Sequence, residues 1–156
     1  MLALRKATDV SRNKPSALVI GADTLVFFNG KILGKPNSPE EAKTMLSKLS
    51  GNVHSVYTGV ALVKTDEAGN ILQEKTFVEE TKVYFGNLSR EEIDNYVEEG
   101  NPMDKAGSYG IQDDRGALFV KRIEGDYYNV VGLPLHSLYR KLKDFAPEAI
   151  SQYSDA

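Results

Sequence analysis

The stretch ALVIGADTLVFF, residues 17–28, decides the fold because it is a nearly continuous apolar run. A run of this kind, rich in β-branched and aromatic residues, is typical of a buried β-strand. The polar residues of GADT interrupt it, so we expect a bend that places Asp23 and Thr24 inside or beside the core. Asn29-Gly30 then predicts a two-residue hairpin turn into a second strand over KILGK.

The segments that follow predict two helices with a pair of strands between them. SPEEAKTMLSKLSG begins with Ser38 as N-cap, has Glu41 to complete a capping box and spaces its apolar residues as a helix requires. VHSVYTGVALVKT and TFVEETKVYF predict an antiparallel pair of strands joined by the turn-rich DEAGN. A second capped helix begins after Ser89, with Glu92 as its box partner, and ends before Gly100.

Residues 1–10 predict the last turns of a helix, because Leu, Ala, Arg and Lys favour helix and Pro15 then prevents its continuation. Further along the chain, ALFVKRIEGDYYNVVG predicts two strands around EGD.

A final helix is predicted to open at Pro134, with Leu135 in its apolar stripe. The residues beyond Pro147 are expected to fray. No repeat or linker divides the sequence, so we interpret it as one α/β domain over residues 1–146 with a tail at residues 147–156.

Composition excludes several classes of function. The 156 residues contain no cysteine, carry 19 basic and 22 acidic side chains and have a net charge of −3. The lack of cysteine excludes thiol catalysis and thiolate metal sites and favours a reducing compartment, so we expect a cytoplasmic location. No cluster of Lys and Arg indicates nucleic-acid binding, and no apolar run is long enough to cross a bilayer. Neither nucleic acid nor membrane is an expected partner.

Two residues near the first strand are candidates for chemistry. A carboxylate at Asp23, between apolar segments, needs a partner, a metal or a function to offset its desolvation, or else it caps the bend through its own backbone. Lys35 lies between a glycine and a proline on a stiff loop, although a lone lysine there is more often merely solvated. His54 and His136 are isolated in the sequence and do not indicate a metal pair.

The stretch DKAGSYGIQ, residues 104–112, gathers an unusual amount of polar chemistry. Asp104 and Lys105 have opposite charges, and Gly107 and Gly110 allow the backbone to turn sharply or to approach a ligand. Gln112 can both donate and accept hydrogen bonds, as reading a nucleobase edge requires. A polar turn with a surface lysine is the alternative, and composition does not choose between the two.

Taken in order, the blocks VIGADTLV, LGKP, AKTMLSKLSGNVHSVYTGVAL, EETKVYF, GNPMDKAGSYGIQ and GDYYNVVGLPL resemble the Maf-type nucleoside triphosphate pyrophosphatases, including the Maf-like domain of animal acetylserotonin methyltransferase-like proteins. The resemblance covers nearly the whole chain. It implies a Maf/ITPase-like α/β fold, with a mixed twisted sheet, flanking helices and two lobes around a cleft. A homodimer is the oligomeric state that it implies.

The resemblance also implies hydrolysis of a nucleoside triphosphate between its α and β phosphates, assisted by a divalent cation, usually Mg²⁺. GADT with GSYGIQ is similar to the branch that favours dTTP and UTP, with Thr24 and Gln112 at the positions for specificity. Asp23 falls where the family has its proton acceptor and is also the candidate metal ligand. Lys6 and Lys35 match family lysines that contact the triphosphate.

Lys105 is a further substrate-binding candidate, and an ion pair that only shapes the loop is the alternative for it. The family's opening phosphate-binding segment, S-x-S-P-R-R, does not occur in this sequence. Ser11-Arg12 cannot replace it, because this pair follows the helix of Lys6. Two hypotheses result: an active pyrophosphatase, or a catalytically impaired nucleotide-binding or regulatory module.

Overall fold

The apolar run forms strand β1 (Leu18–Phe28) in a computed structural model that describes residues 1–100 and 102–154. Asn29 and Gly30 have φ angles of 51° and 81°, and two positive values in succession are what a tight hairpin turn requires. The chain returns as β2 (Lys31–Leu33), which pairs antiparallel with β1. The predicted hairpin is therefore confirmed.

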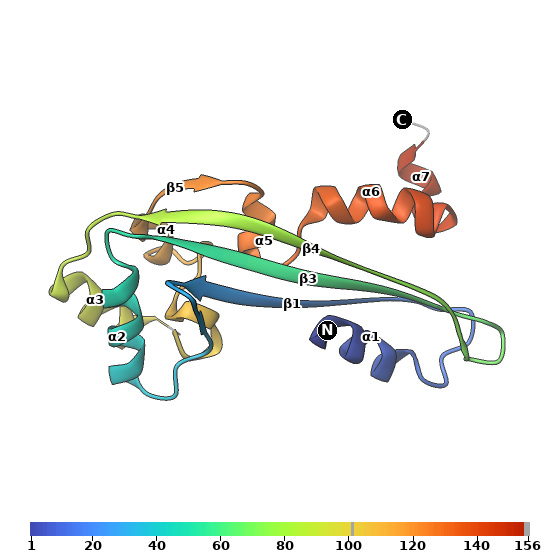
Figure 1. Cartoon of the computed structure of the whole chain (residues 1–156), viewed down its shortest axis with the longest axis horizontal. Coiled ribbons are helices and arrows are strands. Elements are labelled where there is room, and N and C mark those ends of the chain that lie inside the picture. Colours follow the sequence, from blue (N-terminus) through green and yellow to red (C-terminus); the bar gives the residue numbers. More distant parts are fainter. Residues whose placement is uncertain (101, 155–156) are drawn as a thin grey trace. The chain divides into compact units, whose positions relative to one another are not determined.

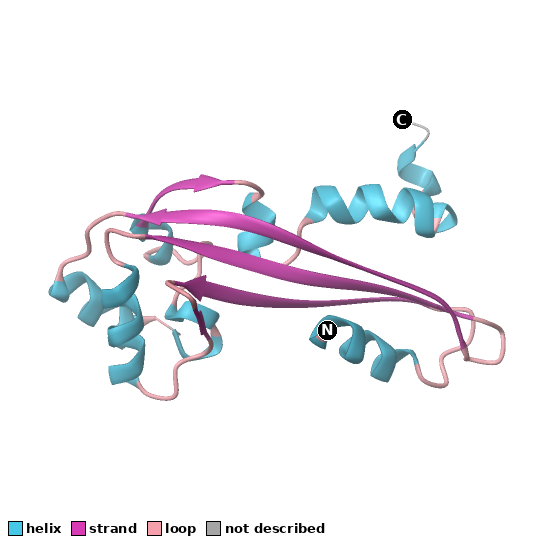
Figure 2. Cartoon of the chain, viewed as in Figure 1, coloured by secondary structure: helices cyan, strands magenta, loops and turns pink. Residues whose placement is uncertain are grey.

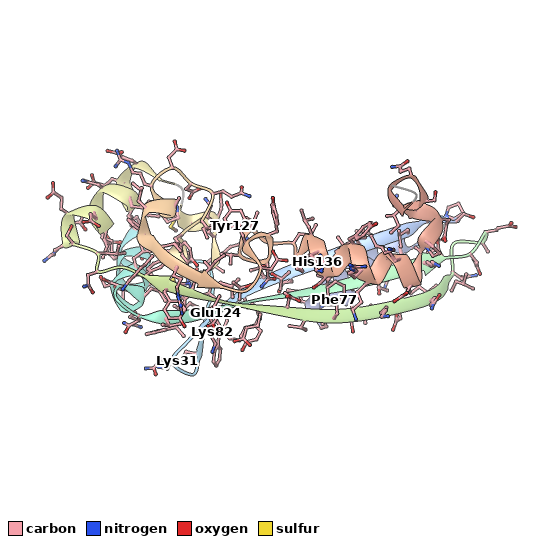
Figure 3. All side chains as sticks on the ribbon, turned by 90° about the horizontal axis from the view of Figure 1, so that it is seen from above. Lys31, Phe77, Lys82, Glu124, Tyr127 and His136 are labelled. Carbon is pink, nitrogen blue, oxygen red and sulfur yellow. The ribbon has the colours of Figure 1, made fainter. Side chains whose placement is uncertain are left out.

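Five strands form one sheet in the order β2-β1-β3-β4-β5 (Figure 1). The long strands β3 (Val53–Thr65) and β4 (Ile71–Phe85) run in opposite directions, as predicted, and β5 (Val120–Glu124) is antiparallel to β4. Lys82 and Glu124 are partners in the β4–β5 register and lie next to each other in Figure 3. The predicted α/β class, a sheet with flanking helices, is confirmed.

The chain divides into two compact units, and the division falls within β1, β3 and β4. Unit 1 consists of Met1–Asp23, Thr58–Glu79 and the chain from Gly132 onward, whereas unit 2 consists of Thr24–Tyr57 and Glu80–Val131. Among the described residues, unit 2 has one cluster of buried apolar side chains and unit 1 has two. No helix in the described ranges combines the length and the apolar character that crossing a bilayer requires.

In unit 2, helices α2 (Pro39–Leu49) and α3 (Arg90–Glu99) lie side by side (Figure 2). Both predicted N-caps are confirmed: the Ser38 and Ser89 hydroxyls each accept a backbone N–H from three residues ahead, at 3.1 Å. The carboxylate of Glu41 accepts the N–H of Asn37, one residue before the cap, at 3.2 Å. The apolar stripes of both helices pack into one core with β1, β3 and β4.

In unit 1, alternate side chains of β3 enter two different cores. Ala61 and Val63 pack with α1 (Leu2–Ser11), whereas Val60 and Leu62 pack with α6 (Leu135–Phe145). Successive side chains of a strand point to opposite faces, so one helix lies on each face of β3. Both predicted terminal helices are thus confirmed, although Leu135 is 46% exposed and lies outside the core. Phe77 of β4 joins the α6 core and is seen beside that helix in Figure 3.

The predicted strand over GDYYNVVG is wrong. This segment forms a short helix, α5 (Tyr127–Val131), and another short helix, α4 (Gly116–Phe119), precedes β5. Asp126 starts α5, because its Oδ1 accepts the N–H groups of Tyr128 and Asn129 at 2.7 and 3.3 Å. The buried Asn129 amide then donates to the Val56 carbonyl at 3.2 Å and to Thr81 Oγ1 at 3.0 Å. These long-range bonds fix α5 on the sheet.

The expectation that the chain frays beyond Pro147 is also wrong within the described residues. Pro147–Ala149 form a 3-10 helix, η3, and Ser151–Ser154 form α7. Ile150, between the two, is buried in the α6 core. The burial of Ile150 and an ion pair between Glu148 and Lys64, at 3.7 Å, both attach this segment to unit 1.

Replacing Asn129 tests how α5 is anchored. Asn129→Leu should lower the free energy of unfolding by about 2 kcal/mol, because the Val56 carbonyl and the Thr81 hydroxyl lose their donor inside the core. Chemical denaturation measures this difference. Asn95→Leu, on the exposed face of α3, is the matched control and should change stability by no more than about 0.5 kcal/mol. Equal losses in the two variants would contradict the anchoring role.

Candidate functional site

A lysine and an aspartate meet in unit 1. Lys6 on α1 places its Nζ 3.0 Å from Oδ1 of Asp23, the last residue of β1 that belongs to this unit. Gly21 makes this approach possible, because a Cβ there would lie 2.5 Å from the backbone oxygen of Ala3. The Lys6 side chain is 51% exposed and that of Asp23 is 23% exposed, so a ligand can reach both.

In unit 2, a backbone hydrogen bond joins two of the sequence motifs. The N–H of Gly107 in DKAGSYGIQ donates to the carbonyl of Gly34 in LGKP at 3.1 Å. Gly107 has a φ of +72°, and a Cβ there would lie 3.1 Å from Cγ2 of the buried Val26. The loop of Lys35 and the loop of Lys105 are therefore held next to each other.

Lys105 forms an ion pair with Asp113, Nζ to Oδ2, at 3.4 Å. Both side chains of the pair lie close to the Gly110 backbone. A Cβ on that glycine would lie 2.8 Å from both Asp113 Oδ2 and Lys105 Cε. An alanine could not occupy this position without moving the pair. Gly110, the second glycine of the motif, therefore allows the Lys105–Asp113 pair to pack against the backbone of the loop.

A pocket of about 470 Å³ opens beside this loop, and Gln112, Lys105, Tyr96 and Asp113 contribute to its lining. Its volume lies within the range of about 300–1,000 Å³ that is usual for small-molecule sites. The exposed Gln112 side chain reaches this pocket, and Ile111 beside it is buried in the core.

The motif is also tied to the core through an aromatic cluster. The ring Nε2 of the buried His54 lies 2.6 Å from the hydroxyl of Tyr109, and both rings contact Phe85 edge to face. Burial lowers the pKa of His54 to about 4, and it raises the pKa of Tyr109. His54 is therefore neutral at physiological pH. Its contact with the Tyr109 hydroxyl ties the motif to the core of unit 2.

The described residues contain no group of three or more His, Asp or Glu side chains arranged to hold a metal ion. A metal site among these residues would therefore have at most two such side chains, with Asp23 as the candidate donor. This donor set suits Mg²⁺, which is usually held by one or two carboxylates together with phosphate oxygens and water. It does not suit a metal that needs a complete cage of protein ligands.

Comparison with known proteins identifies the family. A family profile described as Maf-like protein matches residues 1–145. The chain belongs to the Maf family. A Maf relative from Bacillus cereus (strain G9842), named dTTP/UTP pyrophosphatase, is 51% identical over 144 residues, which make up 92% of this chain and 72% of the relative. Proteins of the same name from Bacillus cereus (strain AH820) and Bacillus anthracis are 52% identical over the same shares of both chains.

The residues proposed from the Maf resemblance are distributed over both units. Lys6 and Asp23 lie in unit 1 and contact each other, whereas Thr24, Lys35, Lys105 and Gln112 lie in unit 2. Sequence reasoning missed two residues that contact the loop of Gln112, namely Tyr96 and Asp113. Tyr96 lies in the helix predicted after Ser89, and no local pattern in the sequence indicates what its hydroxyl contacts.

The buried His54 predicts a pH dependence of stability. Its pKa is about 4 in the folded protein and about 6.5 in the unfolded chain, so below pH 6.5 the unfolded chain binds a proton that the folded protein does not bind. Stability is therefore lost as the pH falls from 6.5 to about 4, by about 3 kcal/mol in total. Urea unfolding at a series of pH values measures this loss.

The variants His54→Gln and His136→Gln separate this effect from the titration of carboxylates. His54→Gln should lack this part of the acid destabilisation, because glutamine does not titrate. His136→Gln, at an exposed position on α6, should retain it. If all three proteins lose stability in parallel, the buried histidine is not the cause.

Proposed function

We propose that this chain hydrolyses dTTP, UTP and related or modified nucleotides to the monophosphate and pyrophosphate. Its relatives at 51% and 52% identity carry the name dTTP/UTP pyrophosphatase, which supports this substrate class. The observation that carries the proposal is the Lys6–Asp23 pair, in which a carboxylate and an ammonium lie 3.0 Å apart and are both accessible. Attack on a phosphate needs both groups, one to accept a proton and one to neutralise charge.

In this proposal Asp23 is the proton acceptor. A water molecule attacks the α-phosphorus, the bond from that phosphorus to the bridging oxygen of the β-phosphate breaks, and the proton of the water passes to the Asp23 carboxylate. The products are the nucleoside monophosphate and pyrophosphate. The neighbouring Lys6 holds the carboxylate in one orientation through their hydrogen bond.

The lysines bind the triphosphate. Lys6, Lys35 and Lys105 each carry an ammonium group, which binds phosphate oxygens as a compact positive charge. Lys35 is exposed on its loop and Lys6 is half exposed, so both can exchange solvent for phosphate. For Lys105, contact with the triphosphate adds to the ion pair that it makes with Asp113.

We infer Mg²⁺ as the cofactor, with Asp23 supplying a carboxylate oxygen and the nucleotide supplying phosphate oxygens. When bound, this ion would neutralise negative charge on the phosphoryl oxygens. Thr24 and Gln112 would read the base: the Gln112 amide can donate to O4 and accept from N3–H of a uracil or thymine ring.

The cytoplasmic location, the homodimer, and the absence of nucleic-acid and membrane partners stay predictions. An enzyme that acts on free nucleotides needs neither a nucleic acid nor a membrane as a partner. The lack of cysteine agrees with a reducing compartment such as the cytoplasm.

The first test is pyrophosphate release from dTTP and UTP in the presence of Mg²⁺. Asp23→Asn should lower kcat at least about 100-fold, because the amide cannot accept the proton. Asp9→Asn is the matched control: Asp9 also lies in unit 1 and pairs with a basic residue, Arg12 at 3.6 Å, but it is exposed on α1. This control should keep full activity.

The outcome also decides between the two hypotheses from the sequence. Nucleotide binding without turnover would favour the catalytically impaired or regulatory module. Turnover that survives Asp23→Asn would contradict the role of Asp23 while leaving the reaction itself in place.

A second test concerns the base. Gln112→Ala should reduce the preference for UTP over GTP by at least about tenfold, because both hydrogen bonds to the base are lost and a loss of about 1.4 kcal/mol already produces that factor. The ratio of kcat/KM for the two nucleotides measures it. Gln73→Ala, at an exposed position on β4, should leave the ratio unchanged. An unchanged ratio in Gln112→Ala would contradict base reading by this residue.

A further inference from the structure

One hydroxyl group contacts both ends of the turn that carries Gln112. Tyr96 lies on α3, outside the motif, and its hydroxyl donates to Asp113 Oδ2 at 2.7 Å. The same oxygen accepts the N–H of Gly110 at 3.2 Å. The turn is closed by a backbone bond from the Asp113 N–H to the Gly110 carbonyl at 3.1 Å. Ile111 and Gln112 therefore lie between two residues that the Tyr96 hydroxyl holds.

The hydroxyl is a fixed point because its ring is fixed. Tyr96 is 2% exposed, and its ring packs edge to face on Phe119 with 5.0 Å between the centroids. Burial, followed by the hydrogen bond to Asp113, raises the pKa of Tyr96, so the hydroxyl keeps the proton that it donates. The turn is thus attached to the core of unit 2 as well as to its own loop.

Two further contacts hold the turn from the other side. Asp113 forms its ion pair with Lys105, so its carboxylate links the turn to the start of the motif. Gly116 allows the chain after the turn to fold back, because a Cβ there would meet the Gly110 carbonyl. Within this arrangement Ile111 points into the core and Gln112 remains exposed.

We propose that Tyr96 is a positioning residue for nucleobase selectivity, which acts by holding the Gly110–Asp113 turn and with it the Gln112 amide. This inference rests on the proposed function. A uracil or thymine ring offers an acceptor and a donor in a fixed order, and only an amide held in one orientation distinguishes that order from the one on a purine. Without the Tyr96 hydroxyl the turn loses both hydrogen bonds that hold its ends. The Gln112 amide can then rotate and bind a purine as well as a pyrimidine.

The test is Tyr96→Phe, which keeps the ring in the core and removes the hydroxyl alone. The ratio of kcat/KM for UTP over GTP should fall by about tenfold, a value that corresponds to the loss of one hydrogen bond. The change should appear in KM, with kcat for UTP nearly unchanged, because the substitution leaves in place the Lys6–Asp23 pair to which the phosphate chemistry is assigned. Tyr84→Phe is the matched control, since its hydroxyl contacts Glu124 at 3.3 Å, away from the turn, and it should keep the ratio.

The double variant Tyr96→Phe/Gln112→Ala separates positioning from a direct effect. If Tyr96 acts through Gln112, the double variant has the selectivity of Gln112→Ala alone. Two losses that multiply, or an unchanged ratio in Tyr96→Phe, overturn the proposal. Should Tyr96→Phe not fold, Asp113→Asn replaces it, because an amide there weakens the hydrogen bond from the Tyr96 hydroxyl. Asp113→Asn also removes the ion pair with Lys105, so only the UTP/GTP ratio is compared, because both nucleotides carry the same triphosphate.

Amide hydrogen exchange distinguishes failure of this inference from failure of the proposed function. The Gly110 amide should exchange faster in Tyr96→Phe than in the wild type and in Tyr84→Phe, because Tyr96 is its acceptor. Unchanged exchange overturns the positioning role whatever the activity. Absence of all turnover overturns the proposed function, and the selectivity is then compared through the dissociation constants for UTP and GTP. An unchanged ratio of those constants in Tyr96→Phe also overturns the inference.

Discussion

Burial of strand β3 on both faces is the constraint on which the rest of the structure depends. In unit 1, Leu62 and Val63 are neighbours in sequence and both fully buried, one under α6 and the other under α1. Each face of the strand must be covered by a helix, because exposing either side chain to water would lose the free energy that its burial contributes to folding. With α1 held on β3 in this way, and with Gly21 opening space for it, the ammonium of Lys6 meets Asp23.

The part of β3 in unit 2 supports two other segments in the same manner. His54 contacts the hydroxyl of Tyr109 and so ties the DKAGSYGIQ motif to the core. The Val56 carbonyl accepts the amide of Asn129 and so holds α5. A loop rich in glycine loses much conformational entropy when it becomes ordered, and buried contacts of this kind offset that cost. The DKAGSYGIQ loop of the candidate site is therefore held in part by β3.

In the proposed function, chemistry and selectivity depend on different parts of the chain. The proton acceptor Asp23 and its partner Lys6 belong to unit 1, whereas Gln112 and the residues that hold its turn belong to unit 2. In this proposal, substitutions around α3 change base preference through the turn of Gln112, whereas substitutions at Asp23 change the phosphate chemistry.

The sequence by itself determined the elements whose signals are local. Asn29-Gly30 specified the hairpin and Ser38 specified a helix start, because a turn and a cap depend on residues a few positions apart. The local signals of GDYYNVVG conflict, because its aromatic and β-branched residues favour a strand whereas Asp126 caps a helix. The tertiary structure decided for the helix, in which the Asn129 amide binds the sheet. It also decided the contact of Tyr96 with Asp113, because helical spacing shows that a ring is buried but not which polar group its hydroxyl will meet. Such partners are brought together only when the core packs.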